Sequence, residues 1–278
     1  MTIRKPCLPA GWYPRRPEEI AQFLKAFEPC EDEAPAAVAP HAGWYYSGAL
    51  AAKAVASLRR SADTVVVLGG HLPAGFPPLY AEEDAVSLPQ GLMELDDEFR
   101  RLLLRRIPGG GDRFQDNTVE VLLPMVKHFF PVARLLWLRL PADPASLDAG
   151  TAIAQTAAAL GRNFVLLGST DLTHYGSNYG FSPQGAGPEA LAWVKTKNDK
   201  AFIDAVLASD PALVLRRALD DRSACSPGPV LACLGCAEYL RAGPPSLLSY
   251  ATSADTAPSV PDSFVGYAAL NWAEAAKH

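Results

Sequence analysis

Three of the five histidines in this 278-residue chain come just after short apolar runs. AAVAP (36–40) leads into His41, TVVVLGG leads into His71, and NFVLLGST leads into Asp171, with His174 close behind. Ligands of open α/β sheets bind beyond the carboxyl ends of the strands, so a common sheet would bring these side chains together. Two neutral imidazoles supply most of a metal site, which needs one or two further ligands. The pattern therefore predicts a metal site at the edge of a sheet.

Taken singly, these residues have ordinary structural interpretations. A lone histidine after a strand is more often a helix cap or a hydrogen-bonded surface group. Asp171, preceded by Ser169 and Thr170, could simply cap a helix. The two remaining histidines do not follow strands, because His128 lies in a helical pattern and His278 is the C-terminal residue. It is the repetition at three strand ends that favours a shared site.

A third ligand could come from Asp171, from His174 or from a cysteine of the segment DDRSACSPGPVLACLGC. Cys225 follows a polar stretch and precedes the helix-start signal PGPV, so we predict that it lies near a helix N-terminus. That position lowers the pKa of a thiol and favours the thiolate, which is the form that binds metals. The residues alone leave the three alternatives open.

Cys233 and Cys236 have the spacing C-x-x-C, which is also found in zinc and iron–sulfur sites. They lie within an apolar helical pattern, however, and further cysteines would have to come from the distant Cys7 or Cys30. Ordinary buried thiols are therefore the favoured interpretation of this pair.

The elements that would position these residues are strands alternating with helices. Solid apolar strands separated by helical patterns indicate an α/β fold with a mostly parallel central sheet and helices on both faces. The predicted strands are 36–40, 63–70, 133–140, 163–169 and 263–270. The predicted helices are 17–27, 47–60, 96–106, 118–130, 142–160, 188–208 and 227–240. No loop resembles an interdomain linker, so we predict a single domain over residues 1–278.

The composition excludes several classes of protein. The formal net charge of −5 and the lack of a basic cluster predict no nucleic-acid partner. No apolar run reaches the roughly 18 residues of a membrane span, and the N-terminal segment lacks the apolar core of a signal peptide. Five cysteines in a chain of this length do not suggest a disulfide framework. We therefore predict a cytoplasmic protein without a membrane span.

Several motifs resemble the Memo family, whose bacterial members are called AmmeMemoRadiSam system protein B. The segments that carry the resemblance are PHAGWYYSG, STDLTHYG, the surroundings of SACSPGP and the terminal SFVGYAAL. RKPCLPAGWYP near the start and SLPQGLMELDDEF further on also resemble segments of that family. The family is similar in fold to the LigB-type extradiol dioxygenases, which hold non-haem Fe(II) with two histidines and a glutamate. The resemblance therefore implies a LigB-dioxygenase-like fold.

The resemblance also implies a set of site residues. Carried over by position, the metal ligands would be His41, His71 and Cys225, with the cysteine in the place of the dioxygenase glutamate. Asp171 and His174 would line the same pocket, and His174 would match the acid/base histidine of the dioxygenases.

On this basis the motif around the first histidine can be interpreted. His41 would end its strand at the floor of the pocket, and Gly43 would let the backbone turn close by. The aromatic residues Trp44, Tyr45 and Tyr46 would pack there and exclude water from the site.

The sequence departs from the family pattern at two places. The family segment E-H-S-x-E-x-x-L-P reads DNTVEVLLP, so Asn117 replaces a pocket histidine while Glu120 and Pro124 are retained. The family segment L-G-P-[SN]-H reads LGGH, which shortens the approach to His71 by one residue. The first change removes a proton-transfer group, and the second could move a ligand.

Three functions are consistent with such a site. The first is a metal-dependent oxidoreductase in which Fe(II) is the expected metal and His174 transfers protons, with copper or zinc as alternatives because a thiolate is a soft ligand. The second is a binding module that holds a metal, a peptide or a small molecule without turnover, which the replacement at Asn117 favours. The third is metal-assisted hydrolysis with Asp171 or His174 activating water. The sequence indicates neither the substrate nor the oligomeric state.

Overall fold

The computed structural model describes residues 1–27 and 33–274, so Cys30 and His278 lie outside the described residues. Its strands are β1 Ile3–Arg4, β2 Ala36–Ala39, β3 Thr64–Leu72, β4 Leu79–Tyr80, β5 Ala85–Leu88, β6 Gly91–Glu94, β7 Gly110–Gly111, β8 Arg134–Pro141, β9 Phe164–Ser169, β10 His174–Gly176, β11 Pro245–Thr252 and β12 Ser263–Trp272. Its α-helices are α1 Pro17–Leu24, α2 Trp44–Ala56, α3 Asp97–Leu104, α4 Asn117–Glu120, α5 Leu123–Phe129, α6 Ala145–Leu160, α7 Pro188–Trp193, α8 Asp199–Leu207, α9 Pro211–Asp220 and α10 Pro227–Leu240.

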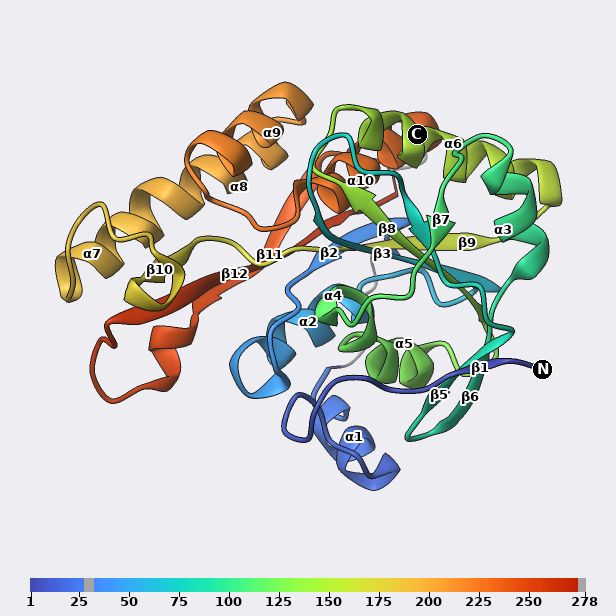
Figure 1. Ribbon diagram of the computed structural model, residues 1–278, viewed down its shortest axis with the longest axis horizontal. Coiled ribbons are helices and arrows are strands. Elements are labelled where there is room, and N and C mark those ends of the chain that lie inside the picture. The colour runs from blue at the N-terminus through green and yellow to red at the C-terminus, as the bar shows by residue number, and fades with distance from the viewer. Residues whose placement is uncertain (28–32, 275–278) are drawn as a thin grey trace.

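A nine-stranded sheet in the described part of the chain forms the centre of the fold, in the order β10-β12-β2-β9-β3-β8-β4-β7 with β11 on β12 (Figure 1). The four neighbours β2, β9, β3 and β8 are parallel. β12 and β4 pair with this block in the antiparallel sense, and so does β11 with β12. The predicted α/β class is confirmed, with a central parallel block that is joined on each side by an antiparallel strand, β12 on one side and β4 on the other.

The adjacency of β2, β9 and β3 is what positions the site. Parallel neighbours end at the same edge of a sheet, so the residues that follow these three strands lie side by side. His41 follows β2, Asp171 follows β9, and His71 lies at the end of β3. The strand-end argument made from the sequence thus rests on strands that are true neighbours.

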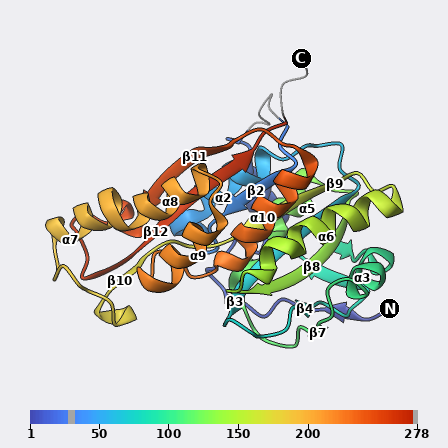
Figure 2. The ribbon, with the colours of Figure 1, turned by 90° about the horizontal axis from the view of Figure 1, so that it is seen from above.

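Helices cover both faces of the sheet, as predicted. Figures 1 and 2 show α6 and α10 on one face, whereas α2 and α5 lie on the other. Along β3, Val65 and Val67 belong to the core beneath α2 and α5, while Val66 and Leu68 belong to the core beneath α6 and α10. Burial on both faces explains why the central strands read as solid apolar runs rather than as alternating ones.

The first turn of α10 is held tightly against the end of β8. A Cβ atom on Gly228 would lie 2.2 Å from the carbonyl oxygen of Pro141, so only glycine fits this approach. The contact places the residues just before α10 at the carboxyl edge of the sheet. It is therefore part of what brings Cys225 to the two histidines.

Some elements differ from the prediction. The helix expected over 118–130 is divided into α4 and α5, and the helix expected over 188–208 contains a π-helical segment, Val194–Asn198. α9 and β11 were not predicted, and neither were the short strands. β11 lacks a solid apolar run because much of it remains accessible to solvent. Within the described residues, no helix has the length and apolar character needed to cross a bilayer.

Candidate metal centre

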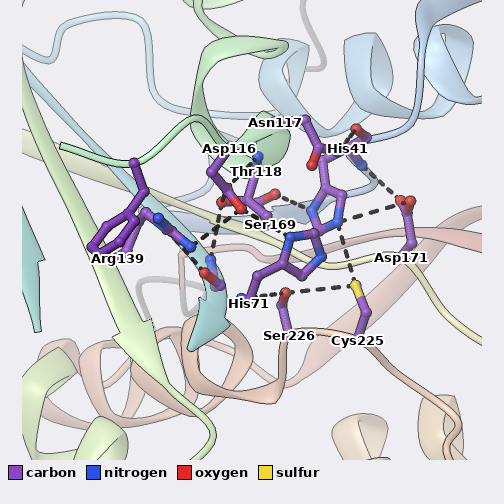
Figure 3. A network of polar contacts seen from close by, with 12 residues as sticks. His41, His71, Asp116, Asn117, Thr118, Arg139, Ser169, Asp171, Cys225 and Ser226 are labelled. Atoms are coloured by element: carbon purple, nitrogen blue, oxygen red, sulfur yellow. Dashed lines mark hydrogen bonds and ion pairs between the residues drawn. The ribbon is translucent and has the colours of Figure 1, made fainter. Parts of the chain in front are cut away.

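His41, His71 and Cys225 meet at the carboxyl edge of the sheet (Figure 3). One donor atom from each residue lies within 4.8 Å of the other two. The Cys225 Sγ is 3.3 Å from Nε2 of His41, and the two imidazole rings are 4.9 Å apart at an angle of 85°. A shared ion lies about 2.0–2.3 Å from each ligand, so this donor set needs only small side-chain shifts to enclose one.

His41 is fixed through both its backbone and its ring. Its backbone N–H donates to Oδ1 of Asp171 at 2.7 Å, and its carbonyl oxygen accepts from the Asn117 amide at 2.8 Å. Its Nδ1 lies 2.6 Å from the hydroxyl of Ser169, the last residue of β9. With Nδ1 engaged, Nε2 is the nitrogen that faces Cys225. Burial lowers the pKa of His41, which favours the neutral imidazole that a metal requires.

His71 is the penultimate residue of β3, rather than a residue that follows the strand, and its φ of 58° is left-handed. The pairing of β3 with β8 is irregular between Gly69 and Leu72, which is where the sequence has the shortened LGGH segment. The backbone N–H of His71 donates to the hydroxyl of Ser226 at 3.2 Å. A Cβ on Gly70 would lie 2.3 Å from Ser226, so glycine is needed for this approach.

Cys225 lies in the loop just before α10, as predicted, and Ser226 is the N-cap residue of that helix. The backbone N–H of Cys225 donates to the carbonyl oxygen of Asp171 at 3.1 Å. Burial alone would raise the pKa of the thiol, but the imidazoles of His41 and His71 outweigh it and lower the pKa from 9.0 to about 6. A thiolate at neutral pH is therefore favoured before any ion is present.

The other two predicted residues face the same cavity. Asp171 is 3% exposed, its Oδ2 lies 3.8 Å from Nε2 of His41, and burial raises its pKa from 3.8 to about 6. His174 has its Nδ1 3.1 Å from the carbonyl oxygen of Leu172 and its ring edge-on to Tyr179. It lies outside the group of three converging donors. The helix cap considered for Asp171 is not formed, because its carboxylate accepts from the His41 loop instead.

The cavity that His41 and His71 line has a volume of about 1000 Å³. Tyr45 and Tyr46 line it but are 72% and 48% exposed, whereas Trp44 is buried and donates its indole N–H to the carbonyl oxygen of Val121. The expectation that these three aromatics close the site against water is therefore wrong. Gly43 is not conformationally required either, because a Cβ there would make only an ordinary contact of 3.6 Å with Trp12.

Two charged residues that the sequence analysis did not single out lie on the Nδ1 side of the His71 ring; they are Asp116 and Arg139. Asp116 places Oδ2 3.0 Å from Nδ1 of His71 and 3.2 Å from the guanidinium of Arg139 (Figure 3). Partial burial alone would lower the pKa of His71, but Asp116 and Cys225 raise it to about 10. Burial alone would raise the pKa of Asp116, but His71, Thr118 and Arg139 lower it. The only sequence signal was the polar start of DNTVE, directly before Asn117.

Glu120, also in that segment, holds one wall of the cavity in place. Its buried carboxylate accepts hydrogen bonds from the backbone N–H groups of Cys7 and Leu8 and from the hydroxyl of Tyr13. The chain between these anchors, residues 10–12, lines the cavity. Glu120 therefore shapes the pocket without facing the three donors.

Cys233 and Cys236 are buried thiols within α10, as favoured from the sequence. The Cys233 thiol donates to the carbonyl oxygen of Ala37 at 3.5 Å. Cys7 contacts Glu120 instead, so the described cysteines do not gather around the C-x-x-C pair.

Comparison with known proteins agrees with the motifs. A MEMO1 family protein of Methanosarcina barkeri is 30% identical over 279 residues, covering 96% of this chain and 99% of the relative. A MEMO1 family protein of Pyrobaculum arsenaticum is 28% identical, covering 97% and 99%. The crystal structure of an uncharacterized protein from Escherichia coli K12 is similar in fold, with a TM-score of 0.50 and 13% identity over 85% of this chain and 99% of that chain. Since the family model described as Memo-like protein matches residues 4–271, the chain belongs to the Memo-like family.

Proposed function

We propose that this protein binds a metal ion with His41, His71 and Cys225 and uses it in an oxidoreductase reaction on a small molecule or peptide held in the cavity above. The observation that carries the proposal is the convergence of three donor atoms within 4.8 Å, two of them from histidines that line a cavity of about 1000 Å³. The ends of β2 and β3, the two strands that flank β9 in the sheet, supply the histidines, and the loop just before α10 supplies the thiol.

The donor set limits the choice of metal. Two imidazole nitrogens and one thiolate suit Fe(II), Cu and Zn(II) rather than Mg²⁺ or Ca²⁺, which prefer oxygen ligands. Fe(II) is the first candidate because the motifs resemble those of proteins related to the extradiol dioxygenases. When bound, a redox-active ion would supply electron transfer and Lewis acidity at the floor of the cavity.

The remaining roles belong to residues of this chain. His174 lines the cavity without joining the donor group, so it is available to exchange a proton with a bound substrate. Asp171 holds the backbone N–H of His41, and its pKa of about 6 places it near the protonation equilibrium at neutral pH. Asn117 donates to the His41 carbonyl oxygen and thereby supports the ligand.

A second function, metal or ligand binding without turnover, is favoured by one observation. The position at which the family pattern has a histidine holds Asn117, whose amide contacts the His41 backbone and cannot exchange a proton at neutral pH. This alternative uses the same cavity and the same three donors. Oxygen uptake or redox cycling of the loaded protein separates the two, because a binding module shows neither.

The experiment that tests the proposal is anaerobic titration of the protein with Fe(II), Zn(II) and Cu(I). One ion should bind per chain, and Cys225→Ser should weaken binding sharply because the thiolate is lost. Cys233→Ser, the matched change at a buried thiol of α10, should leave metal affinity unchanged. If Cys225→Ser binds like wild type, the proposed centre is wrong.

A further inference from the structure

His71 differs from His41 in the group that contacts Nδ1 of its ring. The Nδ1 of His41 meets a neutral hydroxyl, that of Ser169, whereas the Nδ1 of His71 meets the carboxylate of Asp116. Both contacts direct Nε2 toward Cys225, as Figure 3 shows. The two ligands are therefore held by different chemistry, one neutral and one charged.

The carboxylate of Asp116 is itself held by a buried cation. The Arg139 side chain is 4% exposed, and its Nη2 lies 3.2 Å from Oδ2 of Asp116. Its Nε donates to the Gly70 carbonyl oxygen at 3.0 Å, and its Nη1 lies 3.3 Å from Oδ1 of Asp112. Asp112 in turn accepts from the indole N–H of Trp137 at 2.9 Å. With every end engaged, Arg139 has little freedom to rotate away from Asp116.

His71 needs such support more than His41 does. About a third of its side chain is exposed (34%), and its backbone has a left-handed φ of 58°. His41 is 1% exposed and enclosed by the fold. Without a partner on Nδ1, the His71 ring could turn toward solvent, whereas packing alone confines the ring of His41.

We propose that Asp116 is the positioning residue of His71 and that Arg139 fixes Asp116. The three residues then form a chain of contacts from the buried core to the proposed metal centre. This inference rests on the proposed metal-binding function. A carboxylate behind a ligating histidine fixes the tautomer and the orientation of the ring, and its loss costs about 10- to 100-fold in metal affinity. The guanidinium, whose Nη2 lies 3.2 Å from Oδ2 of Asp116, holds that carboxylate in place.

The test is Asp116→Asn. Oδ1 of Asp116 caps α4 by accepting from the backbone N–H of Thr118 at 2.8 Å, and the asparagine carbonyl oxygen can keep that bond. The amide group then replaces Oδ2, and it donates where His71 and Arg139 need an acceptor. We expect Zn(II) and Fe(II) affinity to fall about 10- to 100-fold with the fold retained. Asp116→Ser, which also caps a helix but cannot reach His71, should show the same loss.

The matched control is Asp210→Asn. Asp210 is the N-cap of α9 and accepts from the Leu213 backbone N–H at 2.9 Å, so the same change is made at a cap far from the site. Its metal affinity should equal that of wild type. Equal affinity of Asp116→Asn and wild type would overturn the inference while leaving the proposed function intact. A wild-type protein that binds no metal would overturn both.

Two readouts separate positioning from a general loss of structure. In the Zn(II)-loaded protein, nitrogen–proton NMR should show a protected Nδ1 proton on His71, and Asp116→Asn should abolish that signal while retaining the one from His41. The single variant Arg139→Lys should weaken metal binding, because lysine cannot contact Gly70, Asp112 and Asp116 at once as the guanidinium does. In the Asp116→Asn background it should add little, because the two residues act as one unit. If the losses of metal affinity from the two substitutions are fully additive, the proposed chain of contacts from Arg139 through Asp116 to His71 is contradicted.

Discussion

Cys225 is the residue at which the electrostatics of the site is most directly testable. Burial would raise the pKa of its thiol, yet the two imidazoles lower it to about 6. We expect the metal-free protein to gain a thiolate as the pH rises through about 6, and the Cys225→Ser variant to lack that transition. Ultraviolet thiolate absorbance, or the rate of alkylation as a function of pH, measures it. A transition that persists in Cys225→Ser would assign it to another cysteine.

Protonation of two of the proposed ligands should govern metal affinity. The ion binds a neutral imidazole and a thiolate, so it displaces a proton from His71, whose pKa is raised to about 10, and below about pH 6 also one from Cys225. Competition titrations with Zn(II) at pH 5, 6 and 7 should therefore show affinity that falls about tenfold per pH unit above pH 6 and more steeply below it. Affinity that falls no more steeply below pH 6 than above it would mean that the thiolate is not a ligand.

His174 provides a second test at the residue scale. It lines the cavity but stands outside the three converging donors, so His174→Ala should keep metal affinity close to that of wild type. Any turnover should be lost, because the proton-exchanging group is removed. Metal content after anaerobic loading distinguishes the roles. Loss of metal as complete as in His41→Ala would make His174 a ligand.

Sequence reasoning reached His41, His71, Cys225, Asp171 and His174, but it did not reach Asp116 and Arg139, which hold His71. The five residues follow strand ends or fall in family motifs, which are local signals. Asp116 and Arg139 are 23 residues apart and meet only because α4 packs over the end of β3 beside β8. A charge pair of that kind has no local pattern.

Among the elements, the loop between β9 and β10 is held by an unusual buried acid. Asp199, at the start of α8, accepts from the backbone N–H of Thr173 at 3.0 Å and from the hydroxyl of Tyr250 at 2.8 Å. All its partners in these contacts are neutral, and burial raises its pKa from 3.8 to about 6. Because Thr173 lies between Asp171 and His174, this acid supports the loop that carries Asp171 and leads directly into His174.

The raised pKa of Asp199 predicts a pH dependence of stability. The Asp199 carboxyl binds its proton more tightly in the folded state than in the unfolded chain. Its contribution to the free energy of unfolding is therefore favourable below about pH 4 and is lost as pH rises to about 6. The loss is at most about 3 kcal/mol. The free energy of unfolding of Asp199→Asn, measured relative to that of wild type, should therefore rise as pH increases from 4 to 7. Urea unfolding measures this difference.

The control for that experiment is Asp204→Asn on the same helix. Asp204 is exposed and pairs with Lys200, so its replacement should not reproduce the shift between the two pH values. If both variants show the same pH dependence, the buried carboxyl of Asp199 is not its origin.

Element prediction succeeded where one physical cause dominated. The central strands are buried on both faces, so each appears in the sequence as a continuous apolar run that predicts a strand; these are β2, β3, β8 and β9. β11 is accessible along much of its length and gave no such run. The pattern over 118–130 is that of one helix, but the helix is interrupted after Glu120, and α5 begins at Leu123 with Pro124 in its first turn. Periodicity does not reveal such an interruption.

For the whole molecule, metal binding should appear as thermal stabilisation. An ion that binds only the folded state at 100 times its Kd adds about 2.7 kcal/mol to the free energy of unfolding. For a chain of this size the increase in Tm is roughly 5–10 °C. Scanning with and without Zn(II) under anaerobic conditions should show it, and a chelator should reverse it. Cys225→Ser should show a much smaller increase at the same metal concentration.

The separation of the three donors along the chain has a consequence for when the proposed metal ion could bind. Residues 41, 71 and 225 meet only after β2, β9 and β3 have paired and α10 has docked on β8, so no short peptide segment presents the set. His41 and His71 then line a cavity bordered by the exposed rings of Tyr45 and Tyr46. Under the proposed function, loading would therefore follow folding and would take place through this cavity. We expect the bound ion to be set by the relative supply of free metals around the folded protein, not during synthesis.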